Sequence, residues 1–416
     1  MRTVIALLIL AMTALGANNV SVEAQQPLPH VVDPGDTWPA LAMRFGVEES
    51  ELRAMNPQFN TLRQPAIGST ISLPEEASEQ PGRLVRDGDA GILAIALQYN
   101  VSPWSLALQN ELDSPYRPTF YRPLFVPTEG TIRDLPQGID SLEVSMSPAL
   151  PGVALGIRGT SQQETINLNG HLGGLPLAFA AENNRFIGVA GTGAFFTGGE
   201  PELVLKSGDA PAWVQPWQFA KREWIYQELT LTGEAAQIDQ NARDEERARL
   251  RELWGQITPE PLWQGPFVTP VTTYLEISAE YGARRSYNGG PYLTYHEGVD
   301  YSAYGGTPVM APAAGKVVLA EPLYVRGGTV IIDHGLGIFT GYYHLSAIHA
   351  IAGQAVEPGD LLGEVGTTGL STGNHLHWDL LINGIWVDAA AWQEQRMDCW
   401  LLEGLGRSCA TEQPAD

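Results

Sequence analysis

Basic residues are scarce in this chain of 416 residues: lysine and arginine number 24 against 47 acidic residues, a formal net charge of −23. A surface of that sign repels phosphate backbones, which excludes nucleic acid as a partner. It also repels other anionic polymers at long range, so their recognition would have to rest on short-range contacts. The simplest meaning of the charge is solubility.

Long hydrophobic runs are scarce as well. The apolar run from Val4 to Leu15 holds about 12 residues, short of the ~20 that a membrane span needs. Arg2 precedes it and Val22-Glu23-Ala24 follows it, which predicts a signal peptide over residues 1–24. An uncleaved anchor is the alternative. We expect a secreted protein with no stable membrane span after cleavage.

Cysteine occurs twice, as Cys399 and Cys409. In the oxidising compartment that a signal peptide implies, the two are expected to pair and staple the C-terminal tail, residues 396–416. Two free thiols are the alternative. A zinc site built from them is disfavoured, because no histidine is their neighbour in the sequence.

Glycine and proline are abundant, with 45 and 30 residues, and indicate many turns and a mainly β structure. The length suggests three or four domains. An internal repeat covers the first part, where His30 to Pro74 and Gly82 to Pro127 share one plan of strand, helix, helix and strand. In both copies the second helix is closed by an asparagine, Asn56 or Asn110.

This plan resembles the LysM module, a family that binds glycans containing N-acetylglucosamine. Pro34-Gly35-Asp36-Thr37 and Asn56-Pro57 carry the resemblance in module 1, residues 28–75. Module 2, residues 82–128, is degenerate, because Arg122-Pro123 stands where the family usually has Pro-Gly. Either module serving as a mere spacer is the alternative.

Short alternating runs broken by glycine and proline predict a β-sandwich, here called the middle domain, over residues 131–235. It carries no cluster of metal-ligating residues and is expected to act as a spacer. A helical and proline-rich linker, residues 240–266, follows. Its helix, Asn241 to Ile257, is expected to form internal ion pairs and to bury Leu250, Leu253 and Trp254. We interpret it as a solvated connector.

Six of the eight histidines follow residue 295. His296 and Asp300 are four apart, and Gly298 between them favours a turn that enters a strand. In the segment His375-Leu-His377-Trp-Asp379, alternation places the two histidines and Asp379 on one face of a strand. His344 lies in a further strand-like segment.

Catalytic zinc takes three protein ligands and leaves a position open. A histidine, an aspartate and a second histidine from distant segments can supply that set, and the remaining imidazoles suit proton transfer near neutral pH. A His-x-His pair alone is a weak signal. The combined set is stronger, because it lies within a longer series of motifs.

That series resembles the lysostaphin-like (LytM-type) zinc endopeptidases, which cleave peptide bonds of peptidoglycan. It comprises Tyr281-Gly-Ala-Arg284, His296-Glu-Gly-Val-Asp300, Gly306-Thr-Pro-Val309, Val330-Ile-Ile-Asp-His-Gly335, Tyr343-His-Leu-Ser346, Gly366-Thr-Thr-Gly369 and Ser371-Thr-Gly-Asn-His-Leu-His377. The resemblance implies an antiparallel β-sheet peptidase domain over residues 267–395, here called the C-terminal domain.

The resemblance also implies Zn²⁺ as cofactor, with His296, Asp300 and His377 as ligands. His344 and His375 become the residues that orient water and stabilise the transition state. Asn374 stands where the family often has proline and Asp379 where it often has glutamate. The second departure would alter support for the ligands.

Neighbouring residues are expected to have other roles. His334 is predicted to be structural, while His349 and His171 are predicted at the surface. Alternation points Glu297 away from the site, and Arg284 is open to a substrate carboxylate, stacking or a local hydrogen bond.

The sequence thus predicts a secreted, monomeric zinc endopeptidase that acts on peptidoglycan and is tethered by its modules to N-acetylglucosamine glycan. A non-catalytic wall-binding regulator of other hydrolases is the first alternative. A zinc peptidase that acts on secreted proteins is the second.

Overall fold

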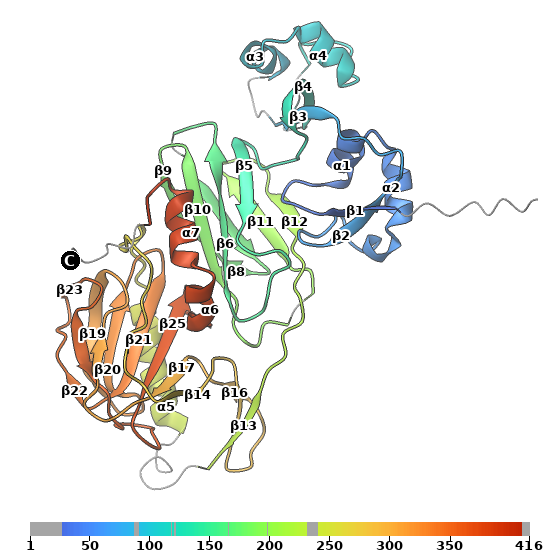
Figure 1. The fold of residues 1–416 in the computed structure, drawn as a ribbon. Helices are drawn as coiled ribbons and strands as arrows, with labels where there is room; N and C mark the ends of the chain where they lie inside the picture. Colours follow the sequence, from blue (N-terminus) through green and yellow to red (C-terminus); the bar gives the residue numbers. More distant parts are fainter. Residues whose placement is uncertain are drawn as a thin grey trace, which may run out of the picture.

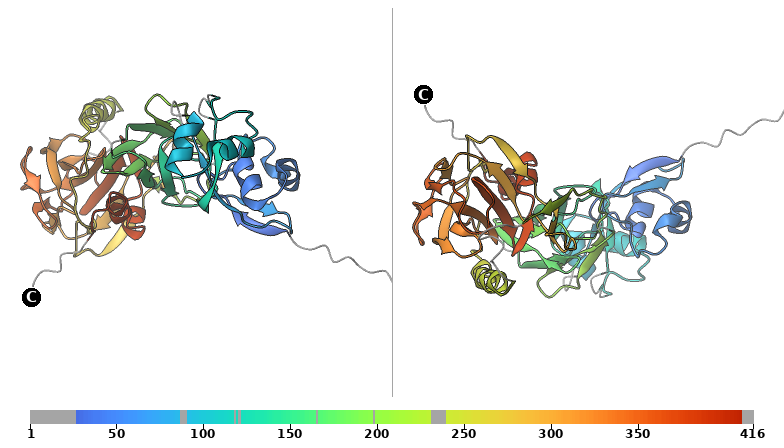
Figure 2. Two further views of the ribbon diagram at one scale, coloured as in Figure 1. Left: turned by 90° about the horizontal axis from the view of Figure 1, so that it is seen from above. Right: turned by 90° about the horizontal axis from the view of Figure 1, so that it is seen from below.

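The computed structural model describes residues 27–86, 91–117, 119, 122–164, 166–197, 199–230 and 240–409. The predicted signal peptide therefore lies outside the described residues. The fold is mainly β, as predicted, and its parts follow one another along the molecule (Figures 1 and 2): the two modules, the middle domain and then the C-terminal domain. No helix within the described ranges is long and apolar enough to cross a membrane.

The two modules repeat one order of elements. Module 1 consists of β1 (Leu28–Val31), α1 (Trp38–Phe45), α2 (Glu49–Met55), a 3-10 turn (Pro57–Phe59) and β2 (Thr70–Leu73). Module 2 consists of β3 (Pro81–Val85), α3 (Gly91–Gln98), α4 (Pro103–Gln109) and β4 (Leu124–Thr131). In each, the two strands pair antiparallel and the helices bury an apolar cluster against them.

Asn56 and Asn110 explain why an asparagine closes the second helix in both copies. The Asn56 amide donates to the carbonyls of Leu52 and Ser72, at 2.8 and 2.9 Å, and its oxygen accepts from the Ser72 N–H at 2.8 Å. Asn110 makes the same three bonds, at 2.9, 2.8 and 2.7 Å, to Leu106 and Phe125. Each asparagine thus ties its helix end to the final strand of its module.

The middle domain contains two four-stranded antiparallel sheets that share one apolar core, which is the predicted β-sandwich. The first sheet has the order β5 (Ile139–Val144), β6 (Ala154–Ser161), β10 (Arg185–Gly191) and β9 (Ala178–Glu182). The second has the order β12 (Trp213–Pro216), β11 (Glu202–Ser207), β7 (Leu168–Leu172) and β8 (Leu175–Pro176). The following strand, β13 (Tyr226–Leu229), leaves the sandwich and pairs in parallel with β15 (Arg284–Tyr287).

An eight-stranded antiparallel sheet forms the C-terminal domain. Its order is β14 (Glu276–Ala279), β17 (Val299–Ser302), β25 (His375–Ile382), β21 (Ile338–Leu345), β20 (Gly327–Asp333), β19 (Gly315–Leu323) and β23 (Ala355–Val356), with β26 (Ile385–Val387) also on β25. β18 (Pro308–Met310), β24 (Leu361–Glu364) and β22 (Ala347–Ile348) form a smaller sheet, and β16 (Thr294–Tyr295) pairs with β15.

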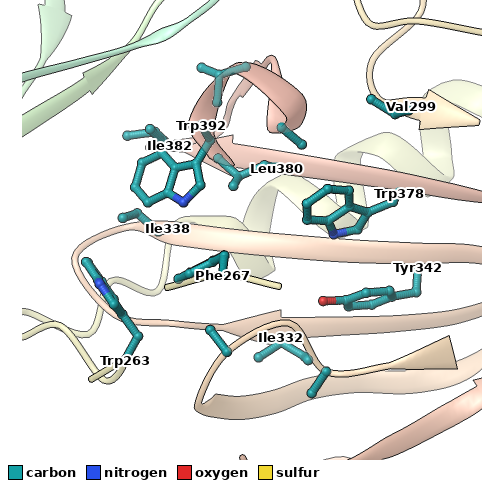
Figure 3. Packing of buried hydrophobic residues seen from close by; sticks show 14 of the residues in the cluster. Trp263, Phe267, Val299, Ile332, Ile338, Tyr342, Trp378, Leu380, Ile382 and Trp392 are labelled. Atoms are coloured by element: carbon teal, nitrogen blue, oxygen red, sulfur yellow. The ribbon is translucent and has the colours of Figure 1, made fainter. Parts of the chain in front are cut away.

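Alternation along β25 separates a dry face of the sheet from the face that carries the polar groups. Trp378 and Leu380 point into the main core together with Tyr342 and Ile332 (Figure 3). On the opposite face, Leu381 belongs to a second apolar cluster under α5. The predicted division of the strand into a polar and an apolar face is therefore confirmed.

The helix α5 (Gln240–Trp254) packs on that second face. Leu250 and Trp254 are buried there and Leu253 packs beside them, as predicted. Two of its arginines pair with the C-terminal domain, Arg247 with Glu297 and Arg249 with Glu321. The helix is thus a wall of the C-terminal domain, and its interpretation as a solvated connector was wrong.

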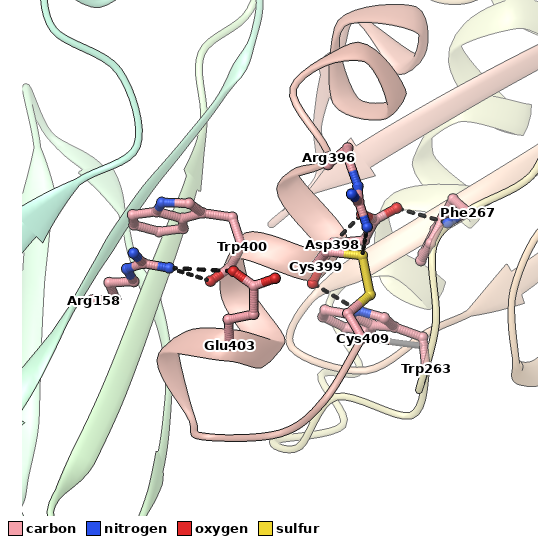
Figure 4. The surroundings of a disulfide bond; sticks show 9 residues. All are labelled: Arg158, Trp263, Phe267, Arg396, Asp398, Cys399, Trp400, Glu403 and Cys409. Carbon is pink, nitrogen blue, oxygen red and sulfur yellow. Dashed lines mark hydrogen bonds and ion pairs between the residues drawn. A yellow bond between two sulfur atoms is a disulfide. The ribbon is translucent and has the colours of Figure 1, made fainter. Parts of the chain in front are cut away.

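The segment treated as a C-terminal tail contains a helix. After α6 (Ala389–Glu394), α7 (Met397–Gly404) packs against β6 and β10 of the middle domain. Cys399 and Cys409 form the predicted disulfide beside it (Figure 4). The Asp398 carbonyl accepts from the Trp263 indole N–H at 3.2 Å, and Arg158 lies 4.6 Å from the Trp400 ring. α7 therefore joins the middle domain to the C-terminal domain.

Candidate active site

Two neighbouring strands bring the predicted ligands together. β17 and β25 pair antiparallel with Asp300 directly opposite His377, so that their side chains share one face. His296 precedes β17 and enters the same space over Gly298. A Cβ at Gly298 would lie 2.8 Å from His377 Nε2, so a larger residue there would displace the ring.

The three donor atoms form a compact triangle. His296 Nε2 lies 2.9 Å from Asp300 Oδ1 and 2.9 Å from His377 Nδ1, and the last two atoms are 2.8 Å apart. His296 and Asp300 are buried, and His377 is half-buried. The structure thus brings together the three residues that the resemblance implies as ligands, from positions up to 81 apart.

The chemistry of this donor set fits a metal ion. His296 Nδ1 donates to the Glu280 carbonyl, 2.9 Å away, so the neutral form of this ring has its lone pair on Nε2, which points into the triangle. Burial lowers the pKa of His377 to about 3, which favours the neutral imidazole, the form that binds metals. Two imidazole lone pairs and a carboxylate in contact repel one another unless a cation lies among them.

The pKa of Asp300 is lowered despite its burial. Burial alone would raise it, but the positive charge that His296 and His377 carry when protonated, and their hydrogen bonds to the carboxylate, outweigh that effect. Arg285 contributes a further contact, since its Nη2 lies 3.3 Å from Asp300 Oδ2.

His344 and His375 flank the triangle without joining it. Their rings are 4.8 Å apart, and His375 Nε2 lies 3.8 Å from Asp300 Oδ1. His344 Nδ1 donates to the Thr368 carbonyl at 2.7 Å, and His375 Nδ1 donates to the Gly373 carbonyl at 2.9 Å. When neutral, each ring therefore keeps an unprotonated Nε2.

Burial, together with the nearby His375, lowers the pKa of His344 to about 4. Its backbone also has a φ of +62°, a left-handed conformation that residues other than glycine seldom adopt. This imidazole is thus held, neutral and in a special conformation, where it can accept a proton.

Asp379 follows His377 by two positions in β25, so both side chains lie on the same face of the strand. Asp379 is fully buried. Its carboxylate accepts from the Trp386 indole at 2.7 Å and from the Tyr343 hydroxyl at 3.3 Å. Burial raises its pKa to about 7, against the lowering effect of Arg326. The Tyr343 ring in turn lies 5.4 Å from the ring of His377. Asp379 therefore supports the predicted ligand His377 indirectly, through its hydrogen bond with Tyr343.

The remaining sequence candidates lie apart from the triangle. His334 is fully buried between the Ala314 carbonyl and the Thr340 hydroxyl, each 2.8 Å from a ring nitrogen, while His349 and His171 are exposed. Arg284 stacks 4.4 Å from the Phe195 ring, which is the stacking alternative, and its hydrogen bond is not local, because it donates at 2.6 Å to the carbonyl of Ala194, 90 positions away.

Glu297 corrects an expectation, because strand alternation was expected to point it away from the site. Its carboxylate instead lines the same pocket as His296, paired with Arg247 at 2.5 Å and Arg326 at 3.5 Å. Alternation did not apply, because Glu297 precedes the first residue of β17, Val299.

Two pockets adjoin the triangle and share Arg285, Tyr287, His344, Leu370 and His377. The first, of about 220 Å³, extends to α5, and the second, of about 330 Å³, extends to β13 and to residues 371–375. Sequence reasoning missed the contributions of α5, β13 and β15. The Arg-Ser-Tyr alternation of residues 285–287 was the available signal.

Comparison with known proteins gives two family matches. Residues 294–389 match Peptidase family M23, and residues 30–74 match the LysM domain. Both agree with the resemblances read from the sequence.

Curated relatives match in the same region. A protein named DD-carboxypeptidase/endopeptidase Mpg, from Neisseria meningitidis, is 40% identical over 124 residues, which cover 29% of this chain and 28% of the relative. Peptidoglycan DD-endopeptidase ShyA of Vibrio cholerae is 37% identical over 120 residues, with the same coverage. The chain therefore spans little more than a quarter of the length of these relatives.

Among solved structures, the catalytic domain of lysostaphin from Staphylococcus simulans is 28% identical. The match covers 32% of this chain and 89% of that domain, with a TM-score of 0.23.

Proposed function

We propose that this chain is an endopeptidase that hydrolyses peptide bonds of peptidoglycan, because residues 294–389 match Peptidase family M23 and residues 30–74 match the LysM domain. One observation carries the proposal. The three-donor triangle lies beside two imidazoles whose Nε2 atoms are free to accept a proton. A site built for structure alone would leave no reason for the second pair.

We propose zinc as the metal, held by His296, Asp300 and His377. Nitrogen and oxygen donors in a set of three are typical of catalytic zinc sites, which keep one position open. When bound, zinc supplies Lewis acidity to a peptide carbonyl and to water. The carbonyl of Glu280 fixes the His296 ring, and Arg285 steadies the free oxygen of Asp300.

His344 and His375 carry the proton chemistry in this proposal. A neutral Nε2 accepts the proton of the attacking water as its oxygen bonds to the carbonyl carbon. The resulting imidazolium stabilises the negative charge on the former carbonyl oxygen and then returns a proton to the leaving amine as the C–N bond breaks. The carbonyls of Thr368 and Gly373 hold the two rings in the required tautomer.

Peptidoglycan is proposed as the substrate because curated relatives of the M23 domain are named peptidoglycan DD-endopeptidases and because a LysM domain precedes the domain here. Module 1 would bind N-acetylglucosamine glycan, and module 2 would extend or space that contact. The chain would then act as a secreted monomer outside the cytoplasm, after loss of residues 1–24.

The test is mass spectrometry of purified peptidoglycan after incubation with the mature protein, with and without a zinc chelator. New peptide termini that vanish with chelator are expected, and their masses identify the bond. Intact peptidoglycan after incubation with protein that holds zinc would reject the enzyme in favour of a wall-binding regulator.

A further inference from the structure

The two pockets beside the metal triangle differ in charge. The α5-side pocket is lined by four arginines, Arg243, Arg247, Arg285 and Arg326, against two carboxylates, Asp244 and Glu297. The pocket on the other side has one arginine, the shared Arg285, and one carboxylate, Asp300, beside uncharged polar residues such as Gln227, Ser278, Thr372 and Asn374. In a chain with a net charge of −23, a cationic pocket next to the reaction centre is a local exception.

Three of these arginines have acidic partners: Arg285 contacts the metal-site carboxylate of Asp300, and Arg326 and Arg247 pair with carboxylates of the pocket wall. Arg326 binds Glu246 at 3.1 Å and Glu297 at 3.5 Å, and Arg247 binds Glu297 at 2.5 Å. Their charges hold α5 against the loop before β20 and against the residue next to His296. They therefore build the wall of the pocket and leave little charge for a ligand.

Arg243 and Arg285 differ from that pair. Within the described residues no carboxylate pairs with Arg243, whose guanidinium lies 5.6 Å from the Tyr287 ring centroid. Its Nε is buried and has no hydrogen-bond partner among the described residues. Arg285 contacts Asp300, which carries the metal-site charge, and the side chain of Gln227.

A buried guanidinium donor without an acceptor, as at Arg243 Nε, is costly, and an anionic ligand would satisfy it. His296 and His377 line the same pocket, so a carboxylate bound there would lie next to the reaction centre, where a group of the peptide substrate can reach it. A planar guanidinium suits a carboxylate, to which it can donate two parallel hydrogen bonds.

We propose that Arg243 and Arg285 form a subsite for a free carboxylate of the peptide substrate, on the α5 side of the scissile bond. The inference rests on the proposed peptidase function and adds the substrate class: a peptide that bears a carboxylate on that side and an uncharged residue on the other. Arg243 acts in binding and specificity.

The test compares soluble cross-linked muropeptides with the same muropeptides after conversion of their carboxylates to carboxamides. Full-length wild type, Arg243→Gln and Arg249→Gln are measured at steady state. Arg249 is the matched control, because it lies on the same helix but pairs with Glu321 outside the pocket. Thermal melts check that each variant is folded.

For wild type, amidation should raise KM about tenfold with kcat changed less than about twofold, since a charge-assisted bond is lost in binding. Arg243→Gln should raise KM about tenfold for the free acid and leave the amidated substrate unaffected. Arg249→Gln should match wild type on both. Equal KM values for acid and amide, or an equal loss on both in Arg243→Gln, would overturn the subsite.

A binding measurement separates this inference from the proposed function. Calorimetric titration of the full-length His344→Ala protein with both muropeptides needs no turnover. If wild type cleaves nothing, the peptidase proposal fails. The subsite still stands if His344→Ala prefers the free acid about tenfold and the Arg243→Gln/His344→Ala double variant loses that preference. The subsite proposal is wrong if the His344→Ala protein and the double variant both bind the free acid and the amidated muropeptide equally well.

Discussion

His296 Nε2 and His377 Nδ1 lie 2.9 Å apart although the two residues are separated by 81 positions, and both nitrogens face Asp300 Oδ1. Removal of a metal from this arrangement would leave two lone pairs and a carboxylate in contact. The triangle therefore links metal binding to the stability of the sheet around β17 and β25.

The first prediction concerns the metal. Wild type should hold one equivalent of zinc, and His296→Ala, Asp300→Ala and His377→Ala should each lose it. Wild type in chelator should be less stable, by on the order of 4 kcal/mol in the free energy of unfolding, than wild type with free zinc at 1,000 times its Kd. Metal analysis and thermal melts measure both effects. His349→Ala removes an exposed imidazole and should retain the metal, while tight zinc binding by all three triangle variants would place the site elsewhere.

The second prediction separates proton transfer from metal binding. His344→Ala should keep its zinc and its fold but lose at least about 100-fold in kcat, because a positioned acid–base group contributes about that much or more. Cleavage of a soluble muropeptide measures the rate, and His349→Ala again serves as the control. A His344→Ala protein that loses zinc would instead show that the imidazole is a ligand.

The third prediction is a pH dependence of stability that arises far from the triangle. Burial lowers the pKa of His334 to about 4 from its ordinary value of 6.5, so the unfolded chain binds a proton more readily than the folded one. The contribution of this neutral imidazole is complete above pH 6.5 and is lost as pH falls from 6.5 to 4. The difference between these two pKa values corresponds to about 3 kcal/mol in the free energy of unfolding.

Denaturant unfolding across pH 4 to 7 checks this. His334→Gln should be less stable than wild type at pH 7, with a shallower loss of stability on acidification. His349→Gln, which alters an exposed histidine, should follow the wild-type profile. Parallel profiles for His334→Gln and wild type would show that another group is responsible.

Much of the site could be predicted from sequence because its information is local. Alternation along β25 is enough to place His375 and His377 on one face, and Gly298 is enough to suggest the turn before Asp300. The asparagine that closes each module is equally local, since Asn110 repeats the bonds of Asn56.

The wall of the site could not be predicted in this way. The pattern of α5 identifies Leu250 and Trp254 as buried, but it does not say which surface buries them. The charge partners of Arg247 and Arg249 lie 50 and 72 positions away, as Glu297 and Glu321, so ion pairs within the helix were the natural expectation. Long-range pairing of this kind leaves no periodic trace in the sequence.

The last prediction concerns the position of module 1. Gln215 in β12 is fully buried at the boundary between module 1 and the middle domain. Its Oε1 accepts from the Gly35 N–H at 2.8 Å, and its Nε2 donates toward the carbonyls of Pro65 and Asp36 at 3.2 and 3.3 Å. Gly35, with a φ of +87°, allows the close approach, because a Cβ there would lie 2.8 Å from the Leu135 side chain.

Gln215→Ala leaves these backbone groups buried without partners, at a cost of about 1–3 kcal/mol each in the fully dry limit. Release of module 1 from the middle domain relieves that cost, because its loops can then reach water. The variant should therefore show a larger radius of gyration in X-ray scattering and faster proteolysis between the two parts, with the C-terminal domain intact. Gln162→Ala, which changes an exposed glutamine of the same domain, should behave as wild type. An unchanged radius in Gln215→Ala would mean that the neighbouring backbone bonds, such as Ile67 N–H to the Pro216 carbonyl at 2.7 Å, suffice to fix the module.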